Sequence, residues 1–116
     1  MQSARAFLLR AQADVLLVAV KPQDAGKLLD EFGMKVPPGK LVVSLCAGLP
    51  TSFFAERLPG GIPVVRVMTN TPALVDQAMT VISAGPYATD EHLALTEEIF
   101  QPLGKTLRVP ESQQDA

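Results

Sequence analysis

Residues 14–22 read DVLLVAVKP, a run of mostly apolar, β-branched residues that ends in a lysine and a proline. Such a run is typical of a strand buried on both faces, as in parallel sheets covered by helices. Pro22 is favoured at the first position of a helix, and apolar residues follow it at helical spacing: Ala25, Leu28, Leu29 and Phe32. We therefore predict a strand over residues 14–20, a helix from Pro22, and its end at Gly33.

The order of strand and helix repeats along the rest of the chain. Apolar runs predict four more strands, at residues 41–46 (LVVSLC), 63–68 (PVVRVM), 79–84 and 105–110 (KTLRVP). A short helix has Thr51 or Ser52 as its cap and ends at the Pro-Gly-Gly of residues 59–61. A longer helix begins after Thr89 and ends at Gly104.

This alternation, with short connections, predicts an α/β fold with a mostly parallel, doubly wound sheet of about five strands and flanking helices. A loop centred on Asn70 precedes the fourth strand. If the sheet is parallel, the carboxyl ends of the first three strands meet at one edge.

Composition indicates one globular domain and excludes several functions. The chain has 116 residues, 47% hydrophobic and 19% charged, with a net charge of −2. Its scattered Lys and Arg form no basic stripe, so we expect no nucleic-acid partner. The longest apolar run, residues 15–20, is too short to span a membrane, so we expect no membrane partner. Residues 1–12 loosely resemble a transit peptide, but a helix leading into the first strand is the simpler interpretation, and we expect a cytoplasmic location.

Other catalytic chemistries find little support in the residues. His92 is the single histidine and Cys46 the single cysteine, so no metal site is expected. Cys46 in an apolar run is more typical of a small core residue than of a nucleophile.

The candidate site lies at the edge where the first three strands end. Lys21 offers a cation beside a helix N-terminus, Gly48 lets a ligand approach the backbone, and Asn70 offers an amide that both donates and accepts hydrogen bonds. Each also has an ordinary interpretation, as a solvated lysine, a loop glycine and a turn asparagine.

Three segments resemble the pyrroline-5-carboxylate reductase family in order and spacing: ADVLLVAVKP at residues 13–22, LVVSLCAGLP at 41–50, and PVVRVMTNTPALV at 63–75. The tail GKTLRVPESQQDA, residues 104–116, resembles the family's passage from its cofactor domain to its helical dimerisation domain. The resemblance implies a partial Rossmann-type domain over residues 1–109, and a connection to that second domain over residues 110–116.

The resemblance also implies a function. The family transfers hydride from NADPH or NADH to the C=N bond of 1-pyrroline-5-carboxylate, which gives L-proline, and it assembles as homodimers or higher homo-oligomers. By resemblance the cofactor (NADP or NAD) would contact Val20, Lys21, Pro22, Ala47, Gly48, Met68 and Asn70. The small-molecule substrate would lie near Asn70, Thr71 and Pro72. The family's catalytic groups are expected beyond residue 116, so none is assigned here.

Two departures from the family are visible. Thr69 stands where the family usually has proline, which changes the loop's backbone freedom and hydrogen bonding. The family's glycine-rich turn has no counterpart before Asp14. We therefore expect an incomplete chain that alone binds NADPH weakly and turns over no substrate. The alternatives are another dehydrogenase of the β-hydroxyacid or deazaflavin-dependent type, and a non-catalytic interaction module built from a Rossmann remnant.

Overall fold

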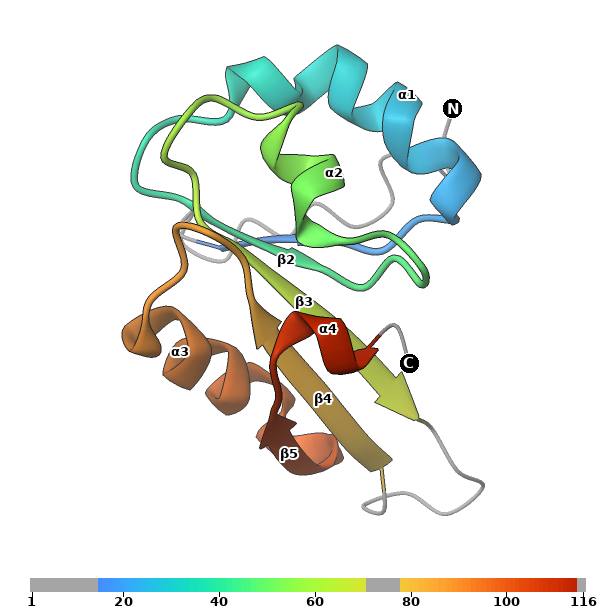
Figure 1. Ribbon diagram of the computed structural model, residues 1–116, viewed down its shortest axis with the longest axis vertical. Helices are drawn as coiled ribbons and strands as arrows, with labels where there is room; N and C mark the ends of the chain where they lie inside the picture. The colour runs from blue at the N-terminus through green and yellow to red at the C-terminus, as the bar shows by residue number, and fades with distance from the viewer. Residues whose placement is uncertain (1–14, 71–77, 115–116) are drawn as a thin grey trace.

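The computed structural model of the protein describes residues 15–70 and 78–114. Within these residues five strands form one sheet and lie in chain order (Figure 1). They are β1 Val15–Val18, β2 Leu41–Ser44, β3 Val64–Asn70, β4 Ala78–Ala84 and β5 Gly104–Arg108. β1, β2 and β3 run parallel, β4 is antiparallel to β3, and β5 is parallel to β4. The predicted α/β class with a mostly parallel sheet is confirmed.

The helices cover both faces of this sheet. They are α1 Pro22–Phe32, α2 Thr51–Ala55, α3 Asp90–Phe100 and α4 Glu111–Gln114, with 3₁₀ turns η3 Gly33–Lys35 and η4 Gln101–Leu103. α1 and α2 lie on one face and α3 on the other, as Figure 1 shows. α4 contacts β4 and lies on the same side as α2. None of the described helices is long and apolar enough to cross a lipid bilayer.

Side-chain alternation along the strands divides the core into two layers. Val42 and Val64 pack with α1 and α2, whereas their sequence neighbours Val43 and Val65 pack on the α3 side. Every residue of β2 is buried. Both faces of this strand are covered, which explains why its sequence is nearly all apolar rather than alternating.

The N-terminus of α3 has the local cap that the sequence predicted. The backbone N–H of His92 donates to the Thr89 hydroxyl at 3.4 Å, and the Thr89 backbone N–H donates to His92 Nδ1 at 2.9 Å. This reciprocal pair is a capping box, and it satisfies two backbone donors at the helix start. The single histidine therefore contributes to the cap, and no three His, Cys, Asp or Glu gather as metal ligands within the described ranges.

Gly33 is the C-cap of α1, which ends at Phe32 as predicted, and the chain continues from there into the 3₁₀ turn η3. The backbone of Gly33 is helical, with φ −56° and ψ −49°, rather than left-handed. A Cβ at this position would collide with the carbonyl oxygen of Arg57, so the glycine is needed for a close approach of two backbones. Phe32, expected on the buried face of α1, is 39% exposed.

Element bounds also differ from those predicted. β3 extends to Asn70, which pairs with Met79, so Asn70 ends a strand rather than centring a loop. The short helix α2 ends at Ala55, before the Pro-Gly-Gly that was expected to stop it. Residue 14 of the first predicted strand and the segment 1–12 lie outside the described residues.

Candidate functional site

The carboxyl ends of β1 and β2 lie side by side because the strand register aligns them. Val18 pairs with Ser44, and Ser44 pairs with Arg66 of β3. The segments that follow Val18 and Ser44 therefore leave the sheet next to each other. This edge, which we call the rim, is where open α/β sheets bind their ligands.

The first rim segment carries Val20, Lys21 and Pro22 into α1. Lys21 is exposed and occupies the N-cap with extended backbone, and its side chain makes no capping hydrogen bond. Pro22 is the first helical residue, while Val20 is half-buried against the core. Pro22 has no N–H and the Asp24 N–H donates to the Lys21 carbonyl oxygen at 2.8 Å, so it is the positive end of the helix dipole that lies beside the Lys21 ammonium. This end of the rim suits an anionic group.

The second rim segment is the loop from Leu45 to Pro50, which joins β2 to α2 and which we call the Gly48 loop. Ala47 and Gly48 are both exposed. Gly48 has φ +78°, a conformation that favours glycine, and no atom lies within 4 Å of the place where its Cβ would be. The loop therefore presents an open stretch of backbone beside the end of β1.

The third segment, from Met68 onward, runs farther than the other two. β3 continues four residues past Arg66, which is about 13 Å at strand rise. Met68 is 41% exposed and shares its strand face with Arg66. The structure thus places Met68 near the rim and Asn70 well beyond it. The predicted substrate-proximal residues Thr71 and Pro72 lie outside the described ranges.

Thr69, which replaces the family's usual proline, makes a cross-strand contact. Its hydroxyl lies 3.4 Å from the hydroxyl of Thr80 on β4. Thr69 therefore gives this end of β3 a polar contact with β4, which is the change in hydrogen bonding expected from the sequence.

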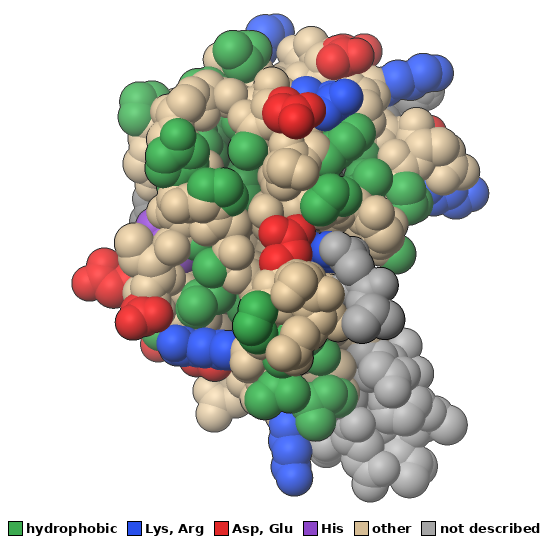
Figure 2. Space-filling view, in the orientation of Figure 1, with side chains coloured by type: hydrophobic (Ala, Val, Ile, Leu, Met, Phe, Trp, Pro, Cys, Tyr) green, Lys and Arg blue, Asp and Glu red, His purple; other side chains and the backbone are tan. Residues whose placement is uncertain are grey.

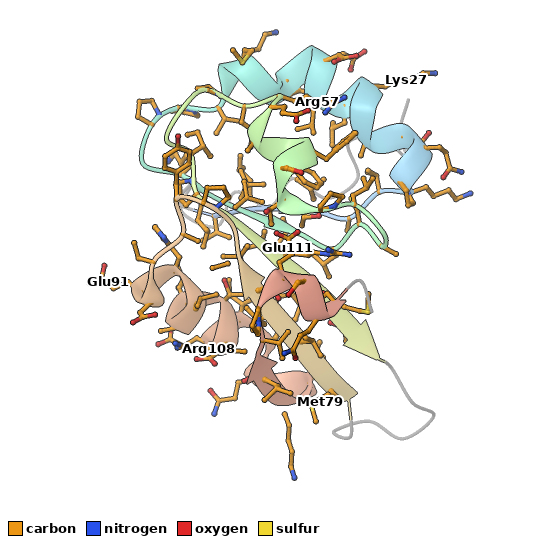
Figure 3. All side chains as sticks on the ribbon, in the orientation of Figure 1. Lys27, Arg57, Met79, Glu91, Arg108 and Glu111 are labelled. Atoms are coloured by element: carbon orange, nitrogen blue, oxygen red, sulfur yellow. The ribbon has the colours of Figure 1, made fainter. Side chains whose placement is uncertain are left out.

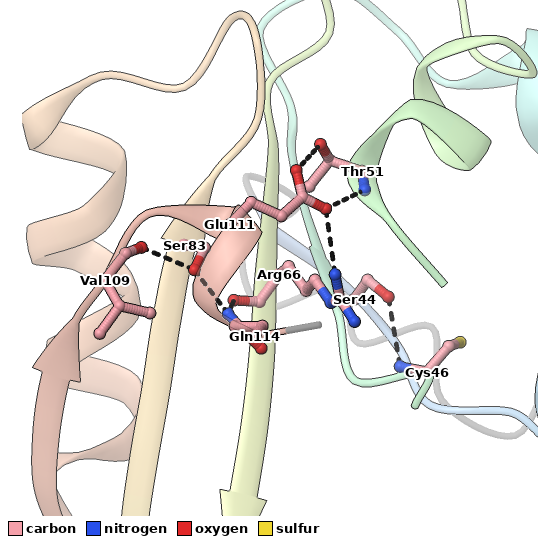
Figure 4. Close-up of polar contacts among 8 residues, drawn as sticks. All are labelled: Ser44, Cys46, Thr51, Arg66, Ser83, Val109, Glu111 and Gln114. Carbon is pink, nitrogen blue, oxygen red and sulfur yellow. Dashed lines mark hydrogen bonds and ion pairs between the residues drawn. The ribbon is translucent and has the colours of Figure 1, made fainter. Parts of the chain in front are cut away.

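A carboxylate that the sequence did not single out lies next to the rim. Glu111, the first residue of α4, accepts hydrogen bonds from the Thr51 backbone N–H and the Thr51 hydroxyl, each at 2.6 Å (Figure 4). The same carboxylate lies 3.3 Å from Nη1 of Arg66, whose side chain is 3% exposed. Figure 3 shows Glu111 at the start of α4, on the side of α4 that faces α2, and its side chain is 23% exposed.

Two further contacts fix α4 against the sheet. Gln114 Nε2 donates to the Ser83 hydroxyl at 2.6 Å and to the Arg66 carbonyl oxygen at 3.3 Å. The Ser83 hydroxyl in turn donates to the carbonyl oxygen of Val109 at 2.7 Å. Because Arg66 and Ser83 are directly opposed on β3 and β4, these contacts attach α4 to both strands (Figure 4).

Sequence reasoning could have found part of this cluster. Arg66 interrupts an otherwise apolar strand, PVVRVM, and a buried cation in such a strand requires an acidic or hydrogen-bonding partner. Nothing local identifies that partner, since Glu111 is 45 residues away. Thr51 or Ser52 was expected to cap α2 with its own hydroxyl. Instead Thr51 is the first helical residue and its hydroxyl donates to Glu111.

Cys46 is a core residue, as expected from its apolar surroundings. It is 2% exposed, and its Sγ lies 3.8 Å from the carbonyl oxygen of Val18. Its backbone N–H donates to the Ser44 hydroxyl at 3.2 Å (Figure 4). These contacts hold the start of the Gly48 loop to the strand ends.

The clearest electrostatic perturbation lies on the opposite face of the sheet. Arg108 donates two hydrogen bonds to Glu97 of α3, at 2.8 and 2.9 Å. The guanidinium holds the pKa of the Glu97 carboxyl below its usual value, and the carboxylate raises the pKa of Arg108. On the face drawn in Figure 2, acidic and basic side chains are interspersed and no broad basic area forms.

An apolar cavity beneath α1 is unsuited to the anionic ligand that the rim would bind. It has a volume of about 180 Å³. Its lining is aliphatic or aromatic except for Gly33 and Lys35: Leu16, Val18, Leu28, Leu29, Phe32, Val36, Pro37, Val42 and Leu58. Such a lining offers few donors to a phosphate-bearing ligand.

Known proteins match this chain in sequence. Residues 3–48 match the family described as NADP oxidoreductase, coenzyme F420-dependent. A pyrroline-5-carboxylate reductase of Methanosarcina acetivorans is 41% identical over 105 residues, which are 90% of this chain and 39% of that protein. One from Schizosaccharomyces pombe is 36% identical over 107 residues, 91% of this chain and 38% of that protein. The chain is a homologue of the pyrroline-5-carboxylate reductases.

Solved structures of these reductases share the fold. The Plasmodium falciparum pyrroline carboxylate reductase, with NADP bound, superposes with a TM-score of 0.81 and 27% identity, covering 99% of this chain and 43% of that one. The Coxiella burnetii pyrroline-5-carboxylate reductase gives a TM-score of 0.76 at 28% identity, with 98% and 42% covered. The chain spans about two fifths of the length of the reductases that it matches.

Proposed function

We propose that this chain supplies one wall of the cofactor site of a pyrroline-5-carboxylate reductase. The wall consists of Lys21, the Gly48 loop and Met68 of β3, and the cofactor is NADP or NAD. The observation that carries the proposal is the register of β1 and β2, which aligns an exposed lysine and an open glycine loop at the carboxyl edge of the sheet. The reductase homologues support the same assignment.

The residues present fit a dinucleotide. Lys21 and the positive end of the α1 dipole suit its phosphates, because cations and helix N-termini stabilise anions. The open backbone at Ala47 and Gly48 suits the flat nicotinamide ring, which approaches closely only where no side chain intervenes. Val20 and Pro22 would border the ribose and pyrophosphate. The bound cofactor supplies the hydride, so the protein's task here is to hold and orient it.

The rest of the proposed reaction concerns the whole reductase. Its substrate would be 1-pyrroline-5-carboxylate, reduced at the C=N bond to L-proline, near Asn70, Thr71 and Pro72. Residues 1–109 would belong to the Rossmann-type cofactor domain, and residues 110–116 would lead toward a helical dimerisation domain. A cytoplasmic location and a homodimer or larger homo-oligomer belong to the same proposal, as does the inability of this chain alone to turn over substrate.

The direct test is an NMR titration of the ¹⁵N-labelled 116-residue chain with NADP⁺. We expect weak binding, with shift changes concentrated at Lys21, Ala47 and Gly48. Lys21→Ala should weaken binding by about fivefold, the effect of losing about 1 kcal/mol of ammonium–phosphate attraction. Lys27→Ala is the matched control, since Lys27 is exposed on the same helix and lies farther from the rim (Figure 3).

Two results would contradict the proposal. One is the absence of any shift change at NADP⁺ concentrations where weak binding saturates. The other is a set of changes confined to the α3 face of the sheet, with equal affinities for the Lys21→Ala and Lys27→Ala variants.

A further inference from the structure

The Gly48 loop is attached at both ends to other parts of the molecule. At its start the Leu45 N–H donates to the Val18 carbonyl oxygen at 2.9 Å. At its end it passes through Pro50 into Thr51, which is 3% exposed and bound to Glu111. The position of the exposed Gly48 therefore depends on two anchors, one of which lies 60 residues away in the sequence.

The second anchor replaces a local helix cap. α2 has five residues, and its N-cap, Pro50, makes no side-chain hydrogen bond. A helix this short has little stability of its own, and its first N–H groups require partners. The Glu111 carboxylate provides a partner for the Thr51 N–H and binds the Thr51 hydroxyl as well, which fixes both the backbone and the side chain of that residue.

The surroundings leave Thr51 little freedom. A Cβ added at Gly85, the residue after β4, would lie 2.9 Å from Thr51 Cβ and 3.1 Å from its Oγ1. Gly85 therefore packs closely against Thr51. Arg66, buried on β3, pairs with the Glu111 carboxylate at 3.3 Å. The Glu111–Thr51 contact thus lies against β3, the end of β4 and α4, with the Glu111 side chain 23% exposed.

We propose that Glu111 is a positioning residue for the cofactor site, acting through Thr51 to hold the Gly48 loop. That Glu111 holds the Gly48 loop is inferred from the contacts described above, and its effect on cofactor affinity rests on the proposed function. Without the carboxylate, the loop loses its second anchor and samples positions in which Gly48 is displaced. Apparent affinity for the cofactor then falls by the fraction of time that the loop spends in its native position.

The choice of variant separates positioning from charge. In Glu111→Ala both contacts to Thr51 are lost. In Glu111→Gln the amide oxygen can still accept from the Thr51 N–H and from Arg66, while the amide NH₂ donates to the Thr51 hydroxyl, which reverses its role. If Glu111 acted instead as a negative charge that repels the cofactor's phosphates, both variants would bind NADP⁺ more tightly.

The experiment uses ¹⁵N-labelled full chain, read first without ligand and then with NADP⁺. We expect Glu111→Ala to shift or broaden the Gly48 amide signal, to speed hydrogen exchange at residues 51–54, and to weaken NADP⁺ binding about tenfold. Glu111→Gln should keep the Gly48 signal near its wild-type position and the affinity within about twofold. Glu98→Ala, an exposed carboxylate on α3, is the control for loss of a charge.

An unchanged Gly48 signal in Glu111→Ala would overturn the inference, and so would equal effects of the Ala and Gln variants. If Glu111→Ala does not fold, Thr51→Val removes the hydroxyl contact alone and should shift Gly48 by a smaller amount. If no form of the chain binds NADP⁺, the proposed function fails, but the Gly48 signal of the free chain still decides whether Glu111 holds the loop.

Discussion

Gly85, the residue after β4, should tolerate no side chain, and the structure gives the size of the effect. A Cβ there would lie 2.8 Å from the Val64 carbonyl oxygen and 2.9 Å from Thr51 Cβ. Both neighbours must move by several tenths of an ångström, and both lie in the buried layer between the sheet and α2. Overpacking of this kind costs about 2–3 kcal/mol, which for a chain of this length corresponds to a fall in Tm of about 10 °C.

Gly60→Ala is the matched control for Gly85→Ala. No atom lies within 4 Å of a Cβ at Gly60, and its φ is not positive. This substitution should stabilise the chain by about 0.5 kcal/mol, because alanine reduces the entropy of the unfolded state. Urea unfolding of the full chain, followed by circular dichroism, measures both variants.

A second substitution sharpens the Gly85 test. Thr51→Ala removes the Thr51 hydroxyl but leaves its Cβ and the Val64 carbonyl oxygen in place. It should therefore not rescue Gly85→Ala. Equal stability of the Gly85→Ala and Gly60→Ala variants would refute the close approach of β3, Thr51 and Gly85 on which the anchored loop depends.

Two further predictions concern α3. Thr89→Ala should destabilise the chain by about 1 kcal/mol through loss of the capping box, whereas Thr89→Ser should be nearly neutral; equal urea midpoints for the two variants would contradict the cap. Glu97→Gln should destabilise the chain at neutral pH, and the difference from wild type should shrink as pH falls below 4.5, since the Glu97 carboxyl has a pKa lowered by Arg108 and contributes stability only while ionised. A difference that stays constant between pH 7 and pH 3 would exclude the pair as its cause.

Local patterns predicted most of the fold because the chain is locally consistent. A pattern of a few residues predicts each of these elements: the apolar runs predict β1 and β2, Pro22 predicts the start of α1, and Thr89 predicts the start of α3. The predicted end of α2 was wrong, because this helix stops at Ala55, before the Pro-Gly-Gly. Gly33 does end α1 as predicted, but its close approach to the Arg57 backbone could not be predicted from the residues around it.

The candidate site divides in the same way. Lys21 and Gly48 follow strands whose parallel order is predictable, so their common location at one edge could be inferred from sequence. The position of Asn70 in a strand could not be inferred from the sequence, because the length of β3 is set by its antiparallel pairing with β4 and not by its own residues. The loop that was expected to bring Asn70 to the rim is instead a strand end about 13 Å along β3 from Arg66.

The structure gives a physical reason for the Val-Pro-Glu-Ser segment, residues 109–112. The sequence alone showed only that these residues resemble the family and did not indicate what they contact. In the structure, the Val109 carbonyl oxygen accepts from Ser83, and Glu111 reaches both Arg66 and Thr51. A buried cation on β3 requires a nearby anion, and a five-residue helix requires a cap; one carboxylate meets both needs at the point where the chain leaves the sheet. A change at Glu111 should therefore alter both the Gly48 loop, through Thr51, and the path of the chain from β5 into α4.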